Sequence, residues 1–190
     1  MNRRIVIFAS GNGSNAQNII EYFLSRETAT VVQVLSNKKD AKVLARAQDL
    51  NVPSQSFTKE ALNDPSKLGK ILDDLNPDLI VLAGFLLKFP SYLVERFPNK
   101  IINIHPALLP NYGGKGMYGM HVHRAVVANN ESFSGITIHF VNEFYDEGGI
   151  IFQARTALSQ NDSPEDVAAK VQALEYLYFP RIIESVILQQ

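Results

Sequence analysis

The chain has 190 residues and a formal net charge of −1, from 18 basic and 19 acidic residues. Because it contains no cysteine, a cysteine nucleophile, a disulfide framework and a thiolate metal site are excluded. The balanced charge gives no general attraction for a polyanion, so nucleic acid is not an expected partner. The length fits one compact domain, residues 1–190, that can bury a sizeable core.

The first apolar run, residues 5–9, begins directly after a short basic N-terminus. This run is too short for a signal peptide or a membrane span. We therefore expect a cytoplasmic protein with no membrane partner, either a monomer or a homodimer.

Short apolar runs alternate with helical stretches along the first half of the chain. The runs are nearly continuous in apolarity, as strands buried on both faces require, and comprise residues 5–9, 31–35, 79–83 and 101–104. Helices are predicted between them, at residues 15–25, 41–50 and 65–75. The alternation predicts an α/β fold with a Rossmann-like, mostly parallel sheet and helices on both faces.

The pattern changes after Ser132. Residues 135–141 and 150–154 are predicted as neighbouring strands that form an antiparallel C-terminal edge of the sheet. Residues 162–165 then offer a capping residue, an early proline and an early acid, which together predict a helix start. This last helix should run through most of residues 167–188, and Pro180 is the point at which it could be interrupted.

A glycine-containing loop follows the first strand and opens the first helix. Its backbone N–H groups can converge on one point, and the helix N-terminus adds partial positive charge. It is neither a Walker loop nor a dinucleotide fingerprint, so a single phosphate monoester is the expected ligand. The alternative is an ordinary turn capped by Ser14. The expected phosphate-binding residues are Gly11, Asn12, Gly13, Ser14 and Asn15.

Polar groups stand at the ends of two later strands. Asn103 and His105 are two residues apart and therefore point to one face, while Pro106 favours an extended backbone at His105. Asp146 lies in the loop between the last two predicted strands. Ligands of open α/β sheets bind at the carboxyl ends of the strands. An amide, an imidazole and a carboxylate together can stabilise an oxyanion and move a proton, which indicates acyl transfer.

The other histidines form no metal-binding spacing, so no metal is expected. His121 and His123 are expected at the surface or in a loop, ahead of a helix at residues 124–129, and His139 could be a core residue or could support the site. The glycine-rich residues 111–119 have two open interpretations, a lid over the substrate and a mobile surface loop.

Three motifs together resemble the phosphoribosylglycinamide formyltransferase family, the folate-dependent glycinamide ribonucleotide transformylases within the formyltransferase superfamily. The motifs are residues 10–15, 103–110 and 135–148, in the family's order, and the resemblance extends from the first strand to Glu175. It implies the formyltransferase fold. It also implies formyl transfer from 10-formyltetrahydrofolate to the amino group of glycinamide ribonucleotide, in de novo purine biosynthesis.

The resemblance implies a role for each matching residue. Asn103, His105 and Asp146 correspond to the family's catalytic residues, and residues 11–15 correspond to its phosphate site. Glu175 corresponds to a substrate-binding acid, although a carboxylate on a helix is usually only solvated. The segments that correspond to the folate pocket act largely through backbone groups and contain Phe85, Leu86, Leu87, Lys88, Phe89, Val141, Asn142, Glu143, Phe144 and Tyr145.

The chain departs from the family pattern in three places. Many relatives have Gly-Pro where this chain has Gly148 and Gly149, and the best-known members carry arginine at the position of Leu87. The loop at residues 113–120 looks longer than in the shortest members. These differences leave the flexibility of the folate loop and the geometry of the lid open.

Three other functions are compatible with the same core. A methionyl-tRNA formyltransferase would need an additional C-terminal nucleic-acid-binding domain and a basic surface. A formyltetrahydrofolate deformylase normally carries an extra N-terminal regulatory domain. Because we expect one catalytic domain and a balanced charge here, both requirements favour the ribonucleotide enzyme. A nucleotide-binding module without catalytic activity would not need Asn103, His105 and Asp146.

Overall fold

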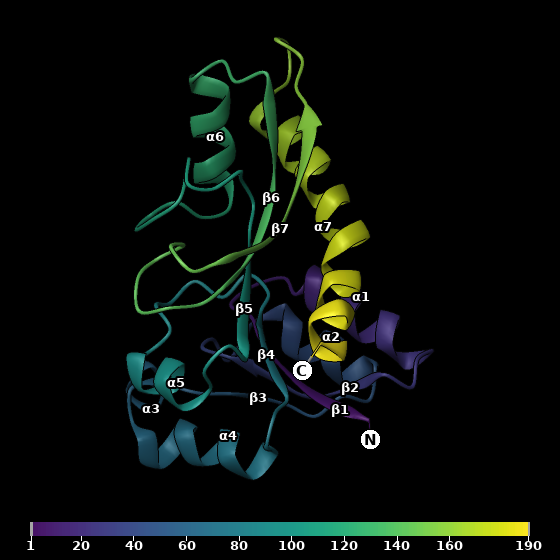
Figure 1. Ribbon diagram of the computed structural model, residues 1–190, viewed down its shortest axis with the longest axis vertical. Helices are drawn as coiled ribbons and strands as arrows, with labels where there is room; N and C mark the ends of the chain where they lie inside the picture. Colours follow the sequence, from purple (N-terminus) through teal and green to yellow (C-terminus); the bar gives the residue numbers. More distant parts are fainter. Residues whose placement is uncertain (1, 190) are drawn as a thin grey trace.

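The structure is a computed structural model that describes residues 2–189. Within that range one sheet has the strand order β3-β2-β1-β4-β5-β6-β7 (Figure 1). The strands are β1 (Arg3–Phe8), β2 (Ala29–Ser36), β3 (Ser54–Ser56), β4 (Leu79–Leu82), β5 (Ile101–His105), β6 (Phe133–Phe140) and β7 (Ile150–Ala157). The pairs from β3 to β5 are parallel, whereas β6 and β7 are antiparallel to their neighbours. The predicted fold class is confirmed.

Helices cover both faces of the sheet. They are α1 (Ser14–Leu24), α2 (Lys42–Asp49), α3 (Lys59–Leu62), the π-helix η1 (Pro65–Gly69), α4 (Lys70–Leu75), α5 (Ser91–Arg96), α6 (Met120–Ala128) and α7 (Pro164–Leu188). Buried residues of α1, α2, α6 and α7 belong to one apolar core, and those of α3, η1, α4 and α5 belong to a second. Figure 1 shows α7 running alongside β6 and β7.

The two cores explain the continuous apolar runs of the central strands. Successive side chains of a strand point to opposite faces of the sheet. Ile5 and Ile7 of β1 belong to the core shared with α1 and α7, whereas Val6 and Phe8 belong to the core shared with α4 and α5. These four side chains are fully buried, so both faces of β1 are apolar from Ile5 to Phe8.

Three short elements have no counterpart in the prediction: β3, α3 and α5. Strand β3 has the sequence Ser-Gln-Ser and pairs with β2 at the edge of the sheet, so it carries no apolar pattern. The predicted helix at residues 65–75 is present as two pieces, η1 followed by α4.

Helix α7 continues through Pro180 without interruption. Proline has no backbone N–H, so the carbonyl oxygen four residues earlier loses its partner in the helix. That carbonyl belongs to Tyr176, and the Asn18 side chain of α1 donates to it with an Nδ2–O distance of 3.0 Å. The neighbouring helix thus replaces the missing hydrogen bond. The helix begins with a capping box in which Ser163 and Asp166 bond to each other's backbone.

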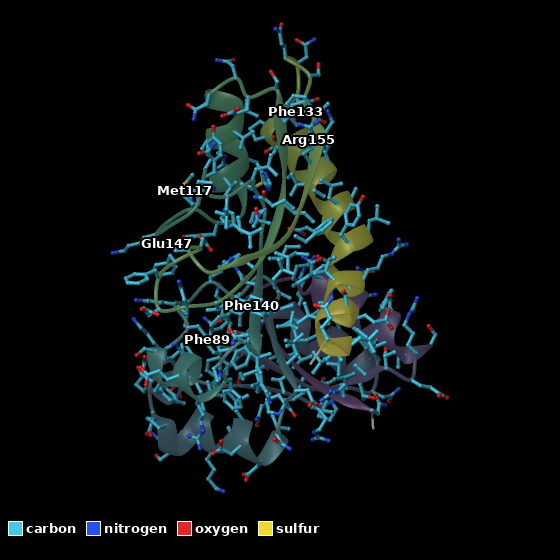
Figure 2. All side chains as sticks on the ribbon, in the orientation of Figure 1. Phe89, Met117, Phe133, Phe140, Glu147 and Arg155 are labelled. Atoms are coloured by element: carbon cyan, nitrogen blue, oxygen red, sulfur yellow. The ribbon has the colours of Figure 1, made fainter. Side chains whose placement is uncertain are left out.

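Strand β6 is paired differently along its length. Residues 137–139 pair with both β5 and β7, and Phe140 pairs with β5 alone, whereas residues 133–136 pair with β7 and not with β5. In this outer half the guanidinium of Arg155 lies over the Phe133 ring, 5.1 Å from its centroid (Figure 2). Among the helices within residues 2–189, none is long and apolar enough to cross a membrane.

Candidate active site

The antiparallel pairing of β5 and β6 sets Asn103 directly opposite His139. The Asn103 Nδ2 atom lies 3.1 Å from His139 Nε2, and His139 Nδ1 lies 2.8 Å from the carbonyl oxygen of Phe140. Because a carbonyl oxygen only accepts, His139 Nδ1 donates to Phe140 and its Nε2 accepts from Asn103. One hydrogen of the Asn103 amide is therefore committed to His139, and the second can serve a ligand.

His105 ends β5 and is 3% exposed. Its Nε2 donates to the carbonyl oxygen of Tyr112 at 2.8 Å, and its Nδ1 lies 3.6 Å from Asp146 Oδ2. Burial lowers the pKa of His105, which the Asp146 carboxylate and the Tyr112 carbonyl only partly oppose. The neutral imidazole therefore presents an unprotonated Nδ1 towards Asp146.

Asp146 faces both histidines from the loop between β6 and β7. Its Oδ1 lies 3.7 Å from His139 Nε2, and its Oδ2 accepts the backbone N–H of Gly114 at 3.0 Å. Burial by itself would raise the pKa of Asp146, but His139, His105 and the Gly114 N–H together hold that pKa below its usual value. The carboxylate is therefore ionised beside His105. Its backbone is left-handed, with φ of 57°, a conformation that aspartate and asparagine tolerate better than most residues.

These groups open into a cavity of about 770 Å³. Its wall also includes residues 85–89 after β4, the loop 114–119, and residues 141, 142, 144 and 145 after β6. Asn15 of α1 and Glu175 of α7 lie in the same wall. The glycine-rich loop before α6 thus borders the site, as the lid interpretation requires.

Glu175 is hydrogen-bonded to Asn15 of the predicted phosphate loop, residues 11–15, rather than simply solvated. Asn15 Nδ2 donates to Glu175 Oε2 at 2.8 Å, and the Asn15 Oδ1 atom is buried without a hydrogen-bond partner among residues 2–189. Burial raises the pKa of Glu175, and the hydrogen bond from Asn15 only partly offsets this effect. The two side chains form one polar corner of the cavity.

The rest of the phosphate loop lies beside that corner. Gly11, Asn12, Gly13 and Ser14 precede or begin α1 but do not line the cavity. The expected alternative, capping by Ser14, is wrong, because the N-cap residue is Gly13, with φ of 77° and no side-chain cap. A Cβ atom on Gly13 would lie 2.4 Å from the Cβ of Val43. Close contact with α2 therefore requires glycine at this position.

The two predicted folate segments meet at the cavity. Phe85, Leu86, Leu87, Lys88 and Phe89 line it, as do Val141, Asn142, Phe144 and Tyr145, whereas Glu143 does not. Phe144 is 56% exposed, and the Lys88 ammonium lies 5.9 Å from the centroid of the Tyr145 ring. An apolar wall with a nearby cation suits a flat ring that carries anionic groups.

The structure corrects the predicted position of His123 and decides between the two interpretations of His139. His123 is buried on α6 and lines the cavity, so its predicted surface position is wrong. The helix begins at Met120 rather than near residue 124, which turns His123 inward together with Val122 and Val126. His121 on the same helix is exposed. His139 is buried between Asn103 and Asp146 and thus supports the site.

Burial lowers the pKa of His123, and the nearby His105 lowers it further. The Nδ1 atom of His123 has no hydrogen-bond partner among the described residues. Residues 2–189 contain no group of three or more histidine, aspartate or glutamate side chains that could hold a metal ion.

An amide, an imidazole and a carboxylate come together at one edge of a mostly parallel sheet. This arrangement indicates an enzyme of the acyl-transfer class. Residues 3–183 match the sequence family described as formyl transferase, and the chain belongs to that family. It is similar to the chloroplastic phosphoribosylglycinamide formyltransferase of Arabidopsis thaliana, with 38% identity over 190 residues that cover 97% of this chain. The chain spans 65% of the length of that relative.

Two further comparisons agree with this assignment. The phosphoribosylglycinamide formyltransferase of Haemophilus influenzae is 37% identical over 96% of this chain and 86% of its own length. The crystal structure of the enzyme of that name from Anaplasma phagocytophilum superposes with a TM-score of 0.90 and 28% identity, over 100% of this chain and 89% of the other. The family resemblance inferred from the three sequence motifs is confirmed.

Proposed function

We propose that this protein transfers the formyl group of 10-formyltetrahydrofolate to the amino group of glycinamide ribonucleotide, a step of de novo purine biosynthesis. The observation that carries the proposal is a single cavity with two different walls. One wall has the polar pair Asn15 and Glu175, and the other has the apolar segments after β4 and β6. Asn103, His105 and Asp146 lie in that same cavity, so two ligands can meet there.

The polar wall suits the ribonucleotide. At the start of α1 the first backbone N–H groups have no intrahelical partner, and the helix dipole favours an anion there. We assign the phosphate to Gly11, Asn12, Gly13, Ser14 and Asn15. Glu175, held by Asn15, accepts hydrogen bonds from the same substrate.

The apolar wall suits the folate. Phe85, Leu86, Leu87, Lys88 and Phe89 form one side of the pterin pocket, largely through backbone groups, and Val141, Asn142, Glu143, Phe144 and Tyr145 form the other. The formyl donor is a cosubstrate, and the reaction needs no metal because amide and imidazole groups face the reacting carbon. The protein acts in the cytoplasm as a single compact domain, either a monomer or a homodimer.

The chemistry follows from the hydrogen-bond pattern. The substrate amine attacks the formyl carbon and produces an oxyanion, to which Asn103 donates the Nδ2 hydrogen that His139 does not use. His105 Nδ1 takes the proton that the attacking amine loses, and the Asp146 carboxylate at 3.6 Å stabilises the resulting imidazolium beside the oxyanion. The same proton then passes to the leaving nitrogen of the folate. Collapse of the tetrahedral species releases tetrahydrofolate. No covalent bond to the protein forms.

The deciding experiment follows tetrahydrofolate production by the purified protein with and without glycinamide ribonucleotide. The proposal requires production that depends on the ribonucleotide. Production without the acceptor would instead indicate a deformylase. Ribonucleotide binding without any tetrahydrofolate production would indicate a binding module that lacks catalytic activity.

A further inference from the structure

One turn of the chain contacts two of the proposed catalytic side chains at once. In the turn 112–114, the carbonyl oxygen of Tyr112 accepts from His105 Nε2 at 2.8 Å. Two residues later the backbone N–H of Gly114 donates to Asp146 Oδ2 at 3.0 Å. The same short segment thus supplies an acceptor to the imidazole and a donor to the carboxylate.

The hydroxyl of the Tyr112 side chain anchors this turn to residues outside it. The Tyr112 hydroxyl donates to Glu131 Oε1 at 2.7 Å and accepts from Asn129 Nδ2 at 2.9 Å. Asn129 is the C-terminal cap of α6, and Glu131 lies in the loop between α6 and β6. Burial raises the pKa of Tyr112, and the Glu131 carboxylate adds to this effect against the hydrogen bond from Asn129, so the hydroxyl keeps its proton and donates.

The turn also has an uncommon backbone that must be held in place. Tyr112 is left-handed with φ of 59°, a conformation rare for a bulky side chain, and Gly114 has φ of 93°. A Cβ atom on Gly113 would lie 2.6 Å from Leu109 Cδ2 and 3.4 Å from Asp146 Cβ. Contacts outside the turn must therefore stabilise this conformation.

We infer that Tyr112 is a positioning residue for His105 and Asp146, with its hydroxyl anchored by Asn129 and Glu131. Its carbonyl fixes the hydrogen of the neutral His105 ring on Nε2 and leaves Nδ1 free towards Asp146. The Tyr112 side chain itself touches neither proposed substrate wall, because Tyr112 does not line the cavity. The catalytic consequence rests on the proposed formyl transfer, whereas the control of the His105 tautomer does not.

The test compares Tyr112→Phe with Tyr22→Phe. The control removes a matched contact, because the Tyr22 hydroxyl donates to Glu184 at 2.6 Å on the outer side of α1 and α7. The first measurement is the ¹⁵N chemical shift of the His105 ring nitrogens without substrate, assigned with a His105→Gln variant. The second is the pH profile of kcat and the KM for both substrates.

We expect Tyr112→Phe to give a mixture of His105 tautomers and a kcat on the order of tenfold lower, below the roughly 10²-fold loss that a displacement of about 1 Å can cause. The pH profile of kcat should shift while both KM values stay within about twofold. Tyr22→Phe should change none of these. Glu131→Ala, which removes the acceptor of the Tyr112 hydroxyl, should act in the same direction as Tyr112→Phe.

A single Nε2–H tautomer together with an unchanged pH profile in Tyr112→Phe would overturn the inference. If Tyr112→Phe fails to fold, Glu131→Ala carries the same test with the same readouts. A wild-type protein without formyl transfer would contradict the proposed function instead, and the ¹⁵N measurement would still decide the role of Tyr112.

Discussion

Asp146 combines a charge with a backbone conformation that few residues share. Its carboxylate lies between His105 and His139, and its φ of 57° places it in the left-handed region. Asparagine tolerates that region as well as aspartate does and keeps an oxygen that can accept from Gly114. Replacing Asp146 with asparagine therefore removes the negative charge and keeps the shape of the side chain.

We predict that Asp146→Asn lowers the single-turnover rate of formyl transfer by on the order of 10²–10⁴, the usual range for losing proton-transfer assistance. The melting temperature should stay close to that of the wild type, because the turn keeps its hydrogen bond to Gly114. Both quantities are measured on one preparation. A fully active Asp146→Asn variant would show that the Asp146 carboxylate has no part in the proposed reaction.

The two glycines of the predicted phosphate loop differ in what surrounds them. A Cβ atom on Gly11 would meet nothing within 4 Å, whereas one on Gly13 would collide with Val43. We predict that Gly11→Val keeps the melting temperature but weakens ribonucleotide binding, since its side chain occupies the proposed anion site. Calorimetric titration with each ligand is the measurement, and folate affinity should not change.

Gly13→Val serves as the contrast to Gly11→Val, because a Cβ atom at Gly13 requires α1 and α2 to move apart. Its melting temperature should fall clearly. Unchanged ribonucleotide affinity in Gly11→Val would contradict the phosphate assignment, and a loss of stability in that variant would show that Gly11 also has a packing role.

The elements of this fold depend on contacts between chain segments that are distant in sequence. Helix α7 continues past Pro180 because Asn18 of α1 supplies the hydrogen bond that the Tyr176 carbonyl loses. This hydrogen bond is exposed, and a hydrogen bond of this kind contributes about 0.5–1.5 kcal/mol. The two helices are thus coupled by one amide side chain.

We predict that Asn18→Ala lowers the free energy of unfolding by about 1 kcal/mol in the wild-type background. In a Pro180→Ala background residue 180 has its own N–H, which can bond the Tyr176 carbonyl, so Asn18→Ala should cost less there. Denaturant unfolding of the four proteins gives the coupling energy. Strictly additive effects would mean that Asn18 does not compensate for the proline.

The central strands were predictable because each is apolar on both faces, and Asn103 and His105 were predictable as a pair because a strand has a period of two. The start of α6 was not. Its N-cap is Gly119 with φ of 52° and no side-chain cap, so the sequence carries no capping signal there. A helix pattern that included Val122 and Val126 would have turned His123 inward.

The role of His139 depends on a register that the sequence does not encode locally. Asn103 and His139 are opposite each other because β5 and β6 pair in one particular alignment. The loop after β6 returns closely over that strand: a Cβ atom on Gly148 would lie 1.7 Å from the carbonyl oxygen of Phe140. Such a contact shows why Gly148 is glycine, but only the folded chain reveals it.

At the scale of the whole molecule, buried titratable groups make stability depend on pH in two opposite directions. His105 and His123 have lowered pKa values, mainly because of burial. Glu175 has a raised pKa, also because of burial. Its contribution is therefore complete below the ordinary glutamate value and is lost as the pH rises through the raised pKa.

For the histidines the sign is the reverse of the Glu175 contribution. Below pH 6.5 the unfolded chain takes up protons that the folded protein does not, so the free energy of unfolding falls as the pH falls towards the lowered pKa values. We predict that His123→Leu reduces this slope, which is at most about 1.4 kcal/mol per pH unit for one proton. The stability of His123→Leu relative to wild type should rise as the pH falls from about 7.5 to 5.

The measurement for this prediction is denaturant unfolding at a series of pH values. His121→Leu on the same helix is the matched control, because it makes the same substitution at an exposed position. A pH-independent difference between His123→Leu and wild type would mean that the folded protein protonates His123 as readily as the unfolded chain does.

The uneven pairing of β6 gives the candidate active site one side that is paired on both edges and one side that is paired on a single edge. Residues 137–139 pair with a strand on both sides and include His139, whereas residues 133–136 form a two-stranded ribbon with β7. Two-stranded ribbons are marginal by themselves, so this end depends on the packing of α6 and α7. Amide hydrogen exchange should therefore be graded along one strand, faster at residues 133–136 than at 137–139. The proposed catalytic residues Asn103 and His105 lie opposite His139 and Thr137, so they belong to the part of the sheet that is paired on both sides of β6.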